Sequence, residues 1–180
     1  MKIDTIDKIS TKGDFVYLMW SEKTDAGKNV YTLDCKQRAI PEFYAKLNQL
    51  ADHVVQILEL PDSWTEGLEP RGVSFTHTET EKGVTMGCVI TSVKRLKSGR
   101  TAVINTPFLP ERPFGNNDAD KTVCLSATCT EVLLELQTQA KRYIGGERLQ
   151  LALFPPTPGK RVATQTRTPK GLTDGTLPTN

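Results

Sequence analysis

The sequence predicts an α+β fold in which an antiparallel sheet of about five strands carries two helices on one face, in the order β-β-α-β-β-β-α. Two segments repeat apolar residues at helical spacing, and five shorter segments are rich in β-branched and aromatic residues. No βαβ unit with a crossover helix is present, which disfavours a parallel doubly wound sheet. Ferredoxin-like and OB-type arrangements both stay compatible with this order.

The first two expected strands form a hairpin. Residues 14–22 (DFVYLMWSE) and 29–35 (NVYTLDC) are rich in the aromatic and branched side chains that favour strands. Between them, residues 25–29 (DAGKN) have the composition of a turn. We therefore expect an antiparallel pair near the start of the domain.

The first expected helix begins at Pro41 and ends before Pro61. Proline is tolerated in the first helical turn because no intrahelical bond uses its missing N–H, and a later proline stops the helix. Apolar residues recur along one face at positions 43, 47, 50, 54, 57 and 58, with polar residues on the other. This spacing predicts an amphipathic helix that packs on the sheet.

A three-stranded meander is expected next, after a loop at residues 61–72. Alternation of apolar and hydroxyl residues predicts a half-buried strand over 73–78. A long strand follows at 84–95, and the turn Lys97–Arg100 leads into the last strand at 101–106.

The second expected helix follows an extended loop at residues 107–121, which contains three prolines. Ser126 is a suitable N-cap, and Gly145-Gly146 ends the helix. Its apolar face is formed by Val132, Leu133, Leu136, Ala140, Tyr143 and Ile144.

Three segments divide the chain. Residues 1–148 are expected to form a single α+β domain, residues 149–154 a linear motif, and residues 155–180 a basic tail rich in Pro and Thr. The tail has few bulky apolar residues, so we expect it to be disordered in isolation. It holds four basic residues and one acidic residue, so residues 1–154 carry 19 basic and 20 acidic residues. A near-neutral domain does not indicate general electrostatic binding of nucleic acid, so any such binding has to use a local basic patch.

Composition also narrows the class of protein. No stretch is apolar enough for a transmembrane helix and no secretory signal is recognisable, so we expect a cytoplasmic protein without membrane contact. Phosphate-loop, GxSxG and HExxH patterns are missing, so we expect no enzyme and no cofactor. The cysteines and histidines do not show the paired spacing of zinc ligands, which predicts reduced thiols and no metal site (Cys35, Cys88, Cys124, Cys129, His53, His77).

His77 lies on the apolar face of its expected strand, where a packed core histidine is the favoured interpretation. A role as general base would require a neighbouring acid and a pocket. A small hydrolase or nuclease would likewise require carboxylates and a histidine in one cleft.

One candidate nucleic-acid contact is a cluster of four cations, Lys94, Arg95, Lys97 and Arg100, at the tip of the expected 84–106 hairpin. Exposed cations at such a tip can reach phosphates, and nearby aromatic rings can stack on single-stranded bases. The aromatic candidates are Tyr17, Trp20, Tyr31 and Phe75, each of which is also a plausible core residue. The structural alternative is a solvated turn that discourages edge pairing.

A second candidate is Gln150-Leu151-Ala152-Leu153-Phe154, directly before Pro155-Pro156. It resembles the sliding-clamp-binding motif of bacterial replication and repair proteins, Gln-Leu-(Ser/Asp)-Leu-Phe. The resemblance implies that Gln150 is the polar anchor, that Leu153 and Phe154 form the hydrophobic anchor, and that Leu151 lies between them. Ala152 departs from the motif and should weaken binding slightly. The alternative is that Leu151, Leu153 and Phe154 pack on the domain as a terminal strand.

Residues 71–113 and 131–154 also resemble small proteins encoded among the early genes of tailed bacteriophages and prophages. The resemblance implies a bacterial host cytoplasm and no particular mechanism. Together these features predict a non-enzymatic accessory protein of DNA replication, recombination or repair that binds single-stranded nucleic acid, the DNA sliding clamp, or both. The alternative is a phage interaction protein that inhibits a host defence factor or sequesters a small ligand.

Overall fold

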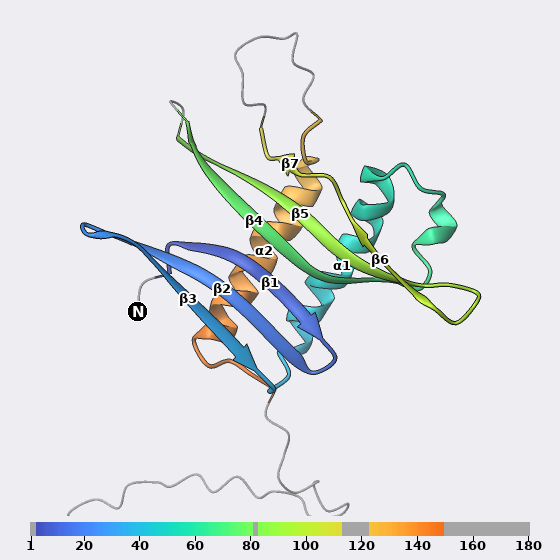
Figure 1. Ribbon diagram of the computed structural model, residues 1–180, viewed down its shortest axis with the longest axis horizontal. Coiled ribbons are helices and arrows are strands. Elements are labelled where there is room, and N and C mark those ends of the chain that lie inside the picture. Colours follow the sequence, from blue (N-terminus) through green and yellow to red (C-terminus); the bar gives the residue numbers. More distant parts are fainter. Residues whose placement is uncertain (1–2, 81–82, 113–122, 150–180) are drawn as a thin grey trace, which may run out of the picture. The chain divides into compact units, whose positions relative to one another are not determined.

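A computed structural model describes residues 3–80, 83–112 and 123–149 (Figure 1). Within these residues the elements are β1 (Thr5–Lys12), β2 (Phe15–Thr24), β3 (Gly27–Cys35), α1 (Pro41–Ile57), a 3-10 turn (Asp62–Trp64), β4 (Leu68–Thr80), β5 (Gly83–Arg95), β6 (Thr101–Asn105), β7 (Leu109–Pro110) and α2 (Ala127–Ile144). The strands form one antiparallel sheet in the order β3-β2-β1-β4-β5-β6, and β7 pairs with β5.

The sheet consists of two similar halves. Three strands precede α1 in the first half, whereas β4, β5, β6 and the two-residue β7 precede α2 in the second. The first strands of the two halves, β1 and β4, meet at the centre. These central strands pair over only three positions, Lys8–Ser10 with Gly72–Ser74. Beyond this junction the β2–β3 and β4–β5 hairpins diverge (Figure 1).

Both helices lie on the same face of the sheet, and no described helix covers the other face (Figure 1). The core between the layers contains fully buried side chains from strands and helices: Ile6, Ile9, Val16, Leu18 and Ile90 with Phe43, Leu47, Leu50, Val54, Leu133, Leu136 and Tyr143. Burial of each such side chain contributes roughly 1.5–3 kcal/mol to folding. An ion pair between Lys46 and Glu135 joins the two helices.

The helix ends follow local chemistry. Pro41 occupies the first turn of α1, and the Ser126 hydroxyl accepts a hydrogen bond of 3.1 Å from the Cys129 N–H at the start of α2. Gly145 caps α2, and Gly146 follows with φ of +102°, a left-handed conformation that favours glycine.

The expected α+β architecture is confirmed, with both helices near their expected limits, but the sheet is larger than the five strands expected. The strand β1 was not expected from the sequence. The strand β4 begins at Leu68, inside the segment expected to be a loop, and β7 lies in the expected loop at 107–121. The register irregularity between Pro70 and Gly72 accommodates a proline that would otherwise indicate a loop.

The four cysteines are free thiols in different surroundings. Burial raises the pKa of Cys88 to about 12 and that of Cys129 to about 11. A hydrogen bond with Tyr143 lowers the pKa of Cys35, which is only half-buried. The two buried thiols therefore behave as apolar core side chains.

Candidate functional site

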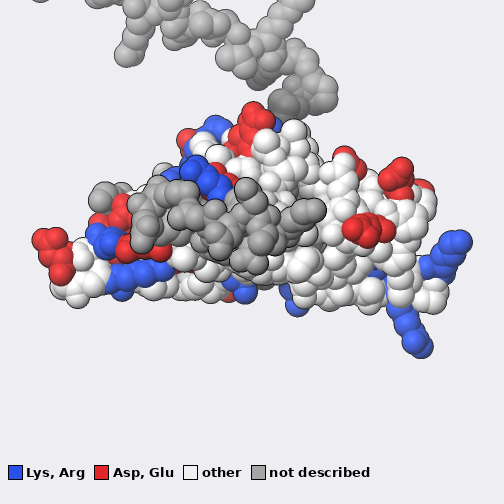
Figure 2. Space-filling model, turned by 90° about the horizontal axis from the view of Figure 1, so that it is seen from above, with Lys and Arg blue, Asp and Glu red and all other residues white. Residues whose placement is uncertain are grey.

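The face of the sheet opposite the helices is the first candidate site. Strand alternation places small polar and apolar side chains there, together with Lys8, Lys12 and Arg95, and most are exposed or half-buried. The helix-free side lies along the lower edge of Figure 2, where Lys and Arg side chains emerge. We call this surface the helix-free face.

Two aromatic rings lie on the helix-free face at the β1–β2 turn. Phe15 is 43% exposed and Tyr17 is half-buried, and both line a groove of about 510 Å³ with Ser10, Lys12 and Asp34. The ammonium of Lys8 lies 5.8 Å from the centre of the Tyr17 ring, and that of Lys36 lies 5.6 Å from the centre of the Phe15 ring. Aromatic rings flanked by cations can stack on bases while the cations contact phosphates.

The structure separates the four cations of the β5–β6 hairpin. Lys94 points toward the helix side, where its ammonium donates a 2.9 Å hydrogen bond to the Trp64 carbonyl and lies 5.8 Å from the centre of the Trp64 ring. The expectation of four free cations is therefore wrong for Lys94, because adjacent strand residues point to opposite faces. Arg95, Lys97 and Arg100 are exposed and make no ion pair within the described residues.

The hairpin tip and the aromatic groove lie at the same end of the sheet. The pairs Lys12–Phe15, Ser10–Gly72 and Leu68–Lys94 place both turns toward the same end of the sheet, with the β5–β6 turn further along the strands (Figure 1). From β2 to β6 the sheet spans four strand spacings, about 19 Å at ~4.8 Å per spacing.

The four aromatic stacking candidates divide between surface and core. Trp20 and Phe75 are 5% and 6% exposed and belong to the core. Tyr17 lies on the helix-free face, whereas Tyr31 stacks on Trp20 with ring centres 5.6 Å apart. Phe15 is an exposed ring that sequence reasoning missed, although alternation with the buried Val16 is a usable signal.

The clamp-motif candidates Gln150, Leu151, Leu153 and Phe154 lie outside the described residues, as does the tail at 155–180.

A second candidate site is a polar groove of about 770 Å³ at the opposite end of the sheet, where the β2–β3 and β4–β5 hairpins diverge. We call it the polar groove. Most of its lining residues are polar or charged: Asp4, Thr5, Ser21, Lys23, Thr24, Asp25, Gly27, Lys28, His77, Glu79 and Val84.

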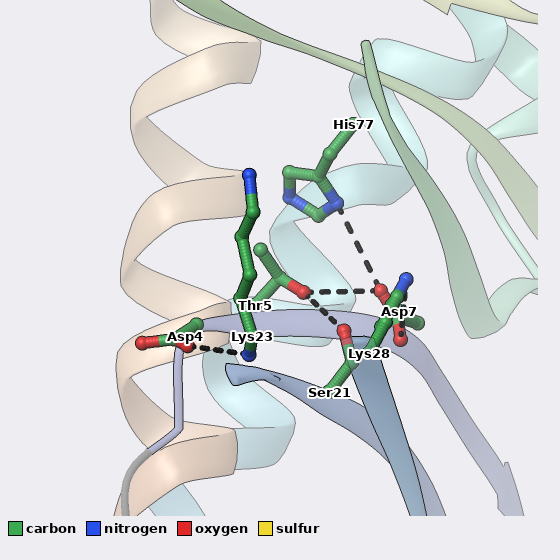
Figure 3. A network of polar contacts seen from close by, with 7 residues as sticks. All are labelled: Asp4, Thr5, Asp7, Ser21, Lys23, Lys28 and His77. Atoms are coloured by element: carbon green, nitrogen blue, oxygen red, sulfur yellow. Dashed lines mark hydrogen bonds and ion pairs between the residues drawn. The ribbon is translucent and has the colours of Figure 1, made fainter. Parts of the chain in front are cut away.

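Asp7 lies at the centre of the contacts beside the polar groove (Figure 3). One of its carboxylate oxygens lies 3.9 Å from His77 Nδ1 and accepts a 3.2 Å hydrogen bond from the Thr5 hydroxyl. The other oxygen lies 3.6 Å from the Lys28 ammonium. The Ser21 hydroxyl lies 2.6 Å from the Thr5 hydroxyl, and either of the two can donate the hydrogen bond.

The structure thus brings an acid and a pocket to His77, the two conditions for a functional role. Burial lowers the pKa of His77, and the nearby Asp7 carboxylate opposes this effect. A neutral imidazole next to a carboxylate can accept a proton or a hydrogen bond from a ligand. No group of three or more metal-ligating side chains occurs among the residues that the structure describes.

Comparisons with protein-family models, curated proteins and solved structures found no match for this chain. None of the described helices is both long and apolar enough to cross a membrane.

Proposed function

We propose that the protein is an accessory factor of DNA replication, recombination or repair that binds single-stranded nucleic acid on the helix-free face. The observation that carries this proposal is the groove at the β1–β2 turn, where Phe15 and Tyr17 are flanked by Lys8, Lys12 and Lys36. Arg95, Lys97 and Arg100 at the same end of the sheet supply further phosphate contacts.

Charge and stacking set the expected strength of binding. About five phosphate contacts predict that the logarithm of the association constant falls with the logarithm of salt concentration with a slope near −3.5. Each stacked base contributes roughly 1–3 kcal/mol. Because the domain is near neutral, binding should be weak above physiological salt.

Fluorescence anisotropy with a labelled single-stranded oligonucleotide tests this function. Phe15→Ala removes one stacking surface and should weaken binding about fivefold or more. Leu134→Ala is the matched control, because Leu134 is 52% exposed on α2, away from the helix-free face. Lys97→Glu should weaken binding and flatten the salt slope, whereas Lys141→Glu, an exposed position on α2, should not. A wild-type chain that binds no oligonucleotide at low salt would refute the proposal.

The sequence motif supports an additional tether to the DNA sliding clamp. Gln150, Leu151, Leu153 and Phe154 match a motif that inserts in a cleft of the clamp ring, and a tether would raise the local concentration of the domain at the replication fork. A pull-down with purified clamp tests this: a Leu153→Ala, Phe154→Ala double variant should lose binding while its unfolding temperature is unchanged. If the clamp retains the double variant as well as wild type, the tether is wrong.

The polar groove favours a function of another class. In this alternative the chain is a phage interaction protein that binds a small polar ligand, and it either sequesters that ligand or inhibits a host factor. His77 and Lys28 offer hydrogen bonds and positive charge, and Asp4 accepts hydrogen bonds. Titration with nucleoside monophosphates, followed by NMR, should shift His77 resonances under this alternative. Shifts confined to the helix-free face would instead favour the nucleic-acid function.

A further inference from the structure

The strand β3 (Gly27–Cys35) forms one edge of the sheet and has a single neighbour, β2. Its nine residues pair with β2 without a register irregularity, and none of them is buried. The segment contains no proline, and Val30 and Tyr31 are 55% and 36% exposed. Natural edge strands are usually protected by a bulge, a proline, a cover or charged side chains. Within the described residues β3 has no bulge, proline or cover, and its only charged side chains are Lys28 and Asp34.

The free hydrogen-bonding groups of β3 can be assigned from its hairpin. The β2–β3 turn holds two residues, so Thr24 and Gly27 form the hydrogen-bonded pair that closes it. Alternation then directs the backbone N–H and C=O groups of residues 28, 30, 32 and 34 away from β2. On the outer edge of β3, the backbone N–H and C=O groups of these four residues have no neighbouring strand among the described residues.

We propose that β3 pairs antiparallel with β3 of a second copy of this chain, about a two-fold axis at Tyr31. In this register Lys28 lies opposite Asp34 of the second copy, Val30 lies opposite Thr32, and Tyr31 lies opposite its own counterpart. The one charged pair, Lys28 with Asp34, is of opposite sign, and the symmetry forms it twice. The two copies then share one continuous sheet with all helices on the same side.

Charge selects this register over its neighbours. Pairing must keep each side chain on its own face of the sheet, so the axis can move only by whole residues. An axis at Thr32 would place Lys28 opposite Lys36, and an axis at Val30 would place neither Lys28 nor Asp34 opposite a charged residue of the second copy. Asp34 is exposed and makes no ion pair within the described residues, so its carboxylate is available to the second copy.

The other edge strand, β6 (Thr101–Asn105), fits a second copy less well. It is five residues long and contains no charged residue. A β3–β6 contact would be head-to-tail and would build open chains of molecules rather than a closed dimer. The β3 pairing does not depend on whether the helix-free face binds nucleic acid.

Sedimentation equilibrium of the full chain tests the charge pairs. A single-strand interface is small, so we expect a weak dimer with a dissociation constant on the order of 10 μM. Asp34→Lys places two lysines opposite each other at both symmetric positions and should raise this constant about tenfold. Adding Lys28→Asp to that variant restores opposite charges and should restore the dimer. A wild-type monomer at all concentrations, or a double variant no better than Asp34→Lys, would overturn the proposal.

Two further variants test the pairing itself. Thr32→Pro removes an outward N–H without touching the ladder to β2, so it should abolish the dimer and leave the far-UV spectrum unchanged. Tyr31→Cys places two thiols on the axis, where Cα atoms of a non-hydrogen-bonded pair are about 4.5 Å apart, and should give a disulfide-linked dimer on oxidation. Asn29→Cys is the control, because its two copies would lie more than ~10 Å apart. Equal cross-linking of both cysteine variants, or a dimer that persists with Thr32→Pro, would show that the assigned register is wrong.

Discussion

Gly72→Ala should destabilise the domain at the junction between its two halves. Gly72 pairs with Ser10 in the short β1–β4 ladder, which has only three residue pairs. A Cβ at this position would lie 3.0 Å from the Ser10 Cα and closer still to the Ile9 carbonyl oxygen. Both are backbone atoms of the neighbouring strand, so rotation of a side chain cannot relieve the contact.

The magnitude follows from one stabilising and two destabilising effects. An ordinary Gly→Ala change within a strand stabilises a protein by about 0.5–1 kcal/mol. Overpacking against backbone costs about 1–3 kcal/mol. Displacement of β1 also weakens ladder hydrogen bonds worth about 1 kcal/mol each, and the ladder is too short to spread this loss. The net expectation is a loss of about 3 kcal/mol in the free energy of unfolding, which for a domain of this size lowers Tm by about 6–12 °C.

Thermal and urea denaturation of the variant provide the measurement. Ser74→Ala is the matched control, because Ser74 is exposed in the same short ladder and its side chain is not packed. The control should unfold close to wild type. A Gly72→Ala variant as stable as the control would refute the tight approach of β1 to β4.

Three other outcomes follow from the structure. Ser126→Ala removes the N-cap of α2 and should lower the free energy of unfolding by about 1 kcal/mol in urea denaturation, and an unchanged midpoint would contradict this cap. The pKa of His77 is lower in the folded state than in the unfolded chain, so the unfolded chain binds more protons at mildly acidic pH. The free energy of unfolding should therefore fall as the pH decreases through the usual histidine pKa near 6.5 and below it. His77→Gln should reduce that pH dependence in thermal scans from pH 7 to 5. In thiol labelling at neutral pH, Cys35 should react quickly, whereas Cys88 and Cys129 should react only after denaturation, and rapid native labelling of either would place it outside the core.

The sequence predicted those elements whose hydrophobic period is regular. Both helices have a regular apolar face, β5 has an alternating apolar run at Met86, Cys88 and Ile90, and the limits of all three elements agree closely with the structure. The strand β1 was not predicted, because a register shift between Ile6 and Lys8 interrupts the alternation of inward and outward side chains. Its inward residues Ile6 and Ile9 are therefore three positions apart, a spacing that does not indicate a strand.

The candidate sites were less predictable than the fold because they depend on side-chain direction and on long-range pairing. Once the inward face of each strand is known, alternation alone predicts that Lys94 and Arg95 point to opposite faces and that Phe15 is exposed. The proximity of Asp7 to His77 could not have been predicted, because it depends on the pairing of β1 with β4. Residues far apart in the sequence acquire a common site only through that topology.

The two tryptophans give the molecule a separate optical reporter at each end of the sheet. Trp20 stacks on Tyr31 of the edge strand β3, and the Trp64 ring lies next to the Lys94 ammonium at the base of the β5–β6 hairpin. Replacement of one tryptophan by phenylalanine would leave emission from the other alone. Self-association could then be followed in a variant that keeps only Trp20, and oligonucleotide binding in a variant that keeps only Trp64, in both cases without an added dye.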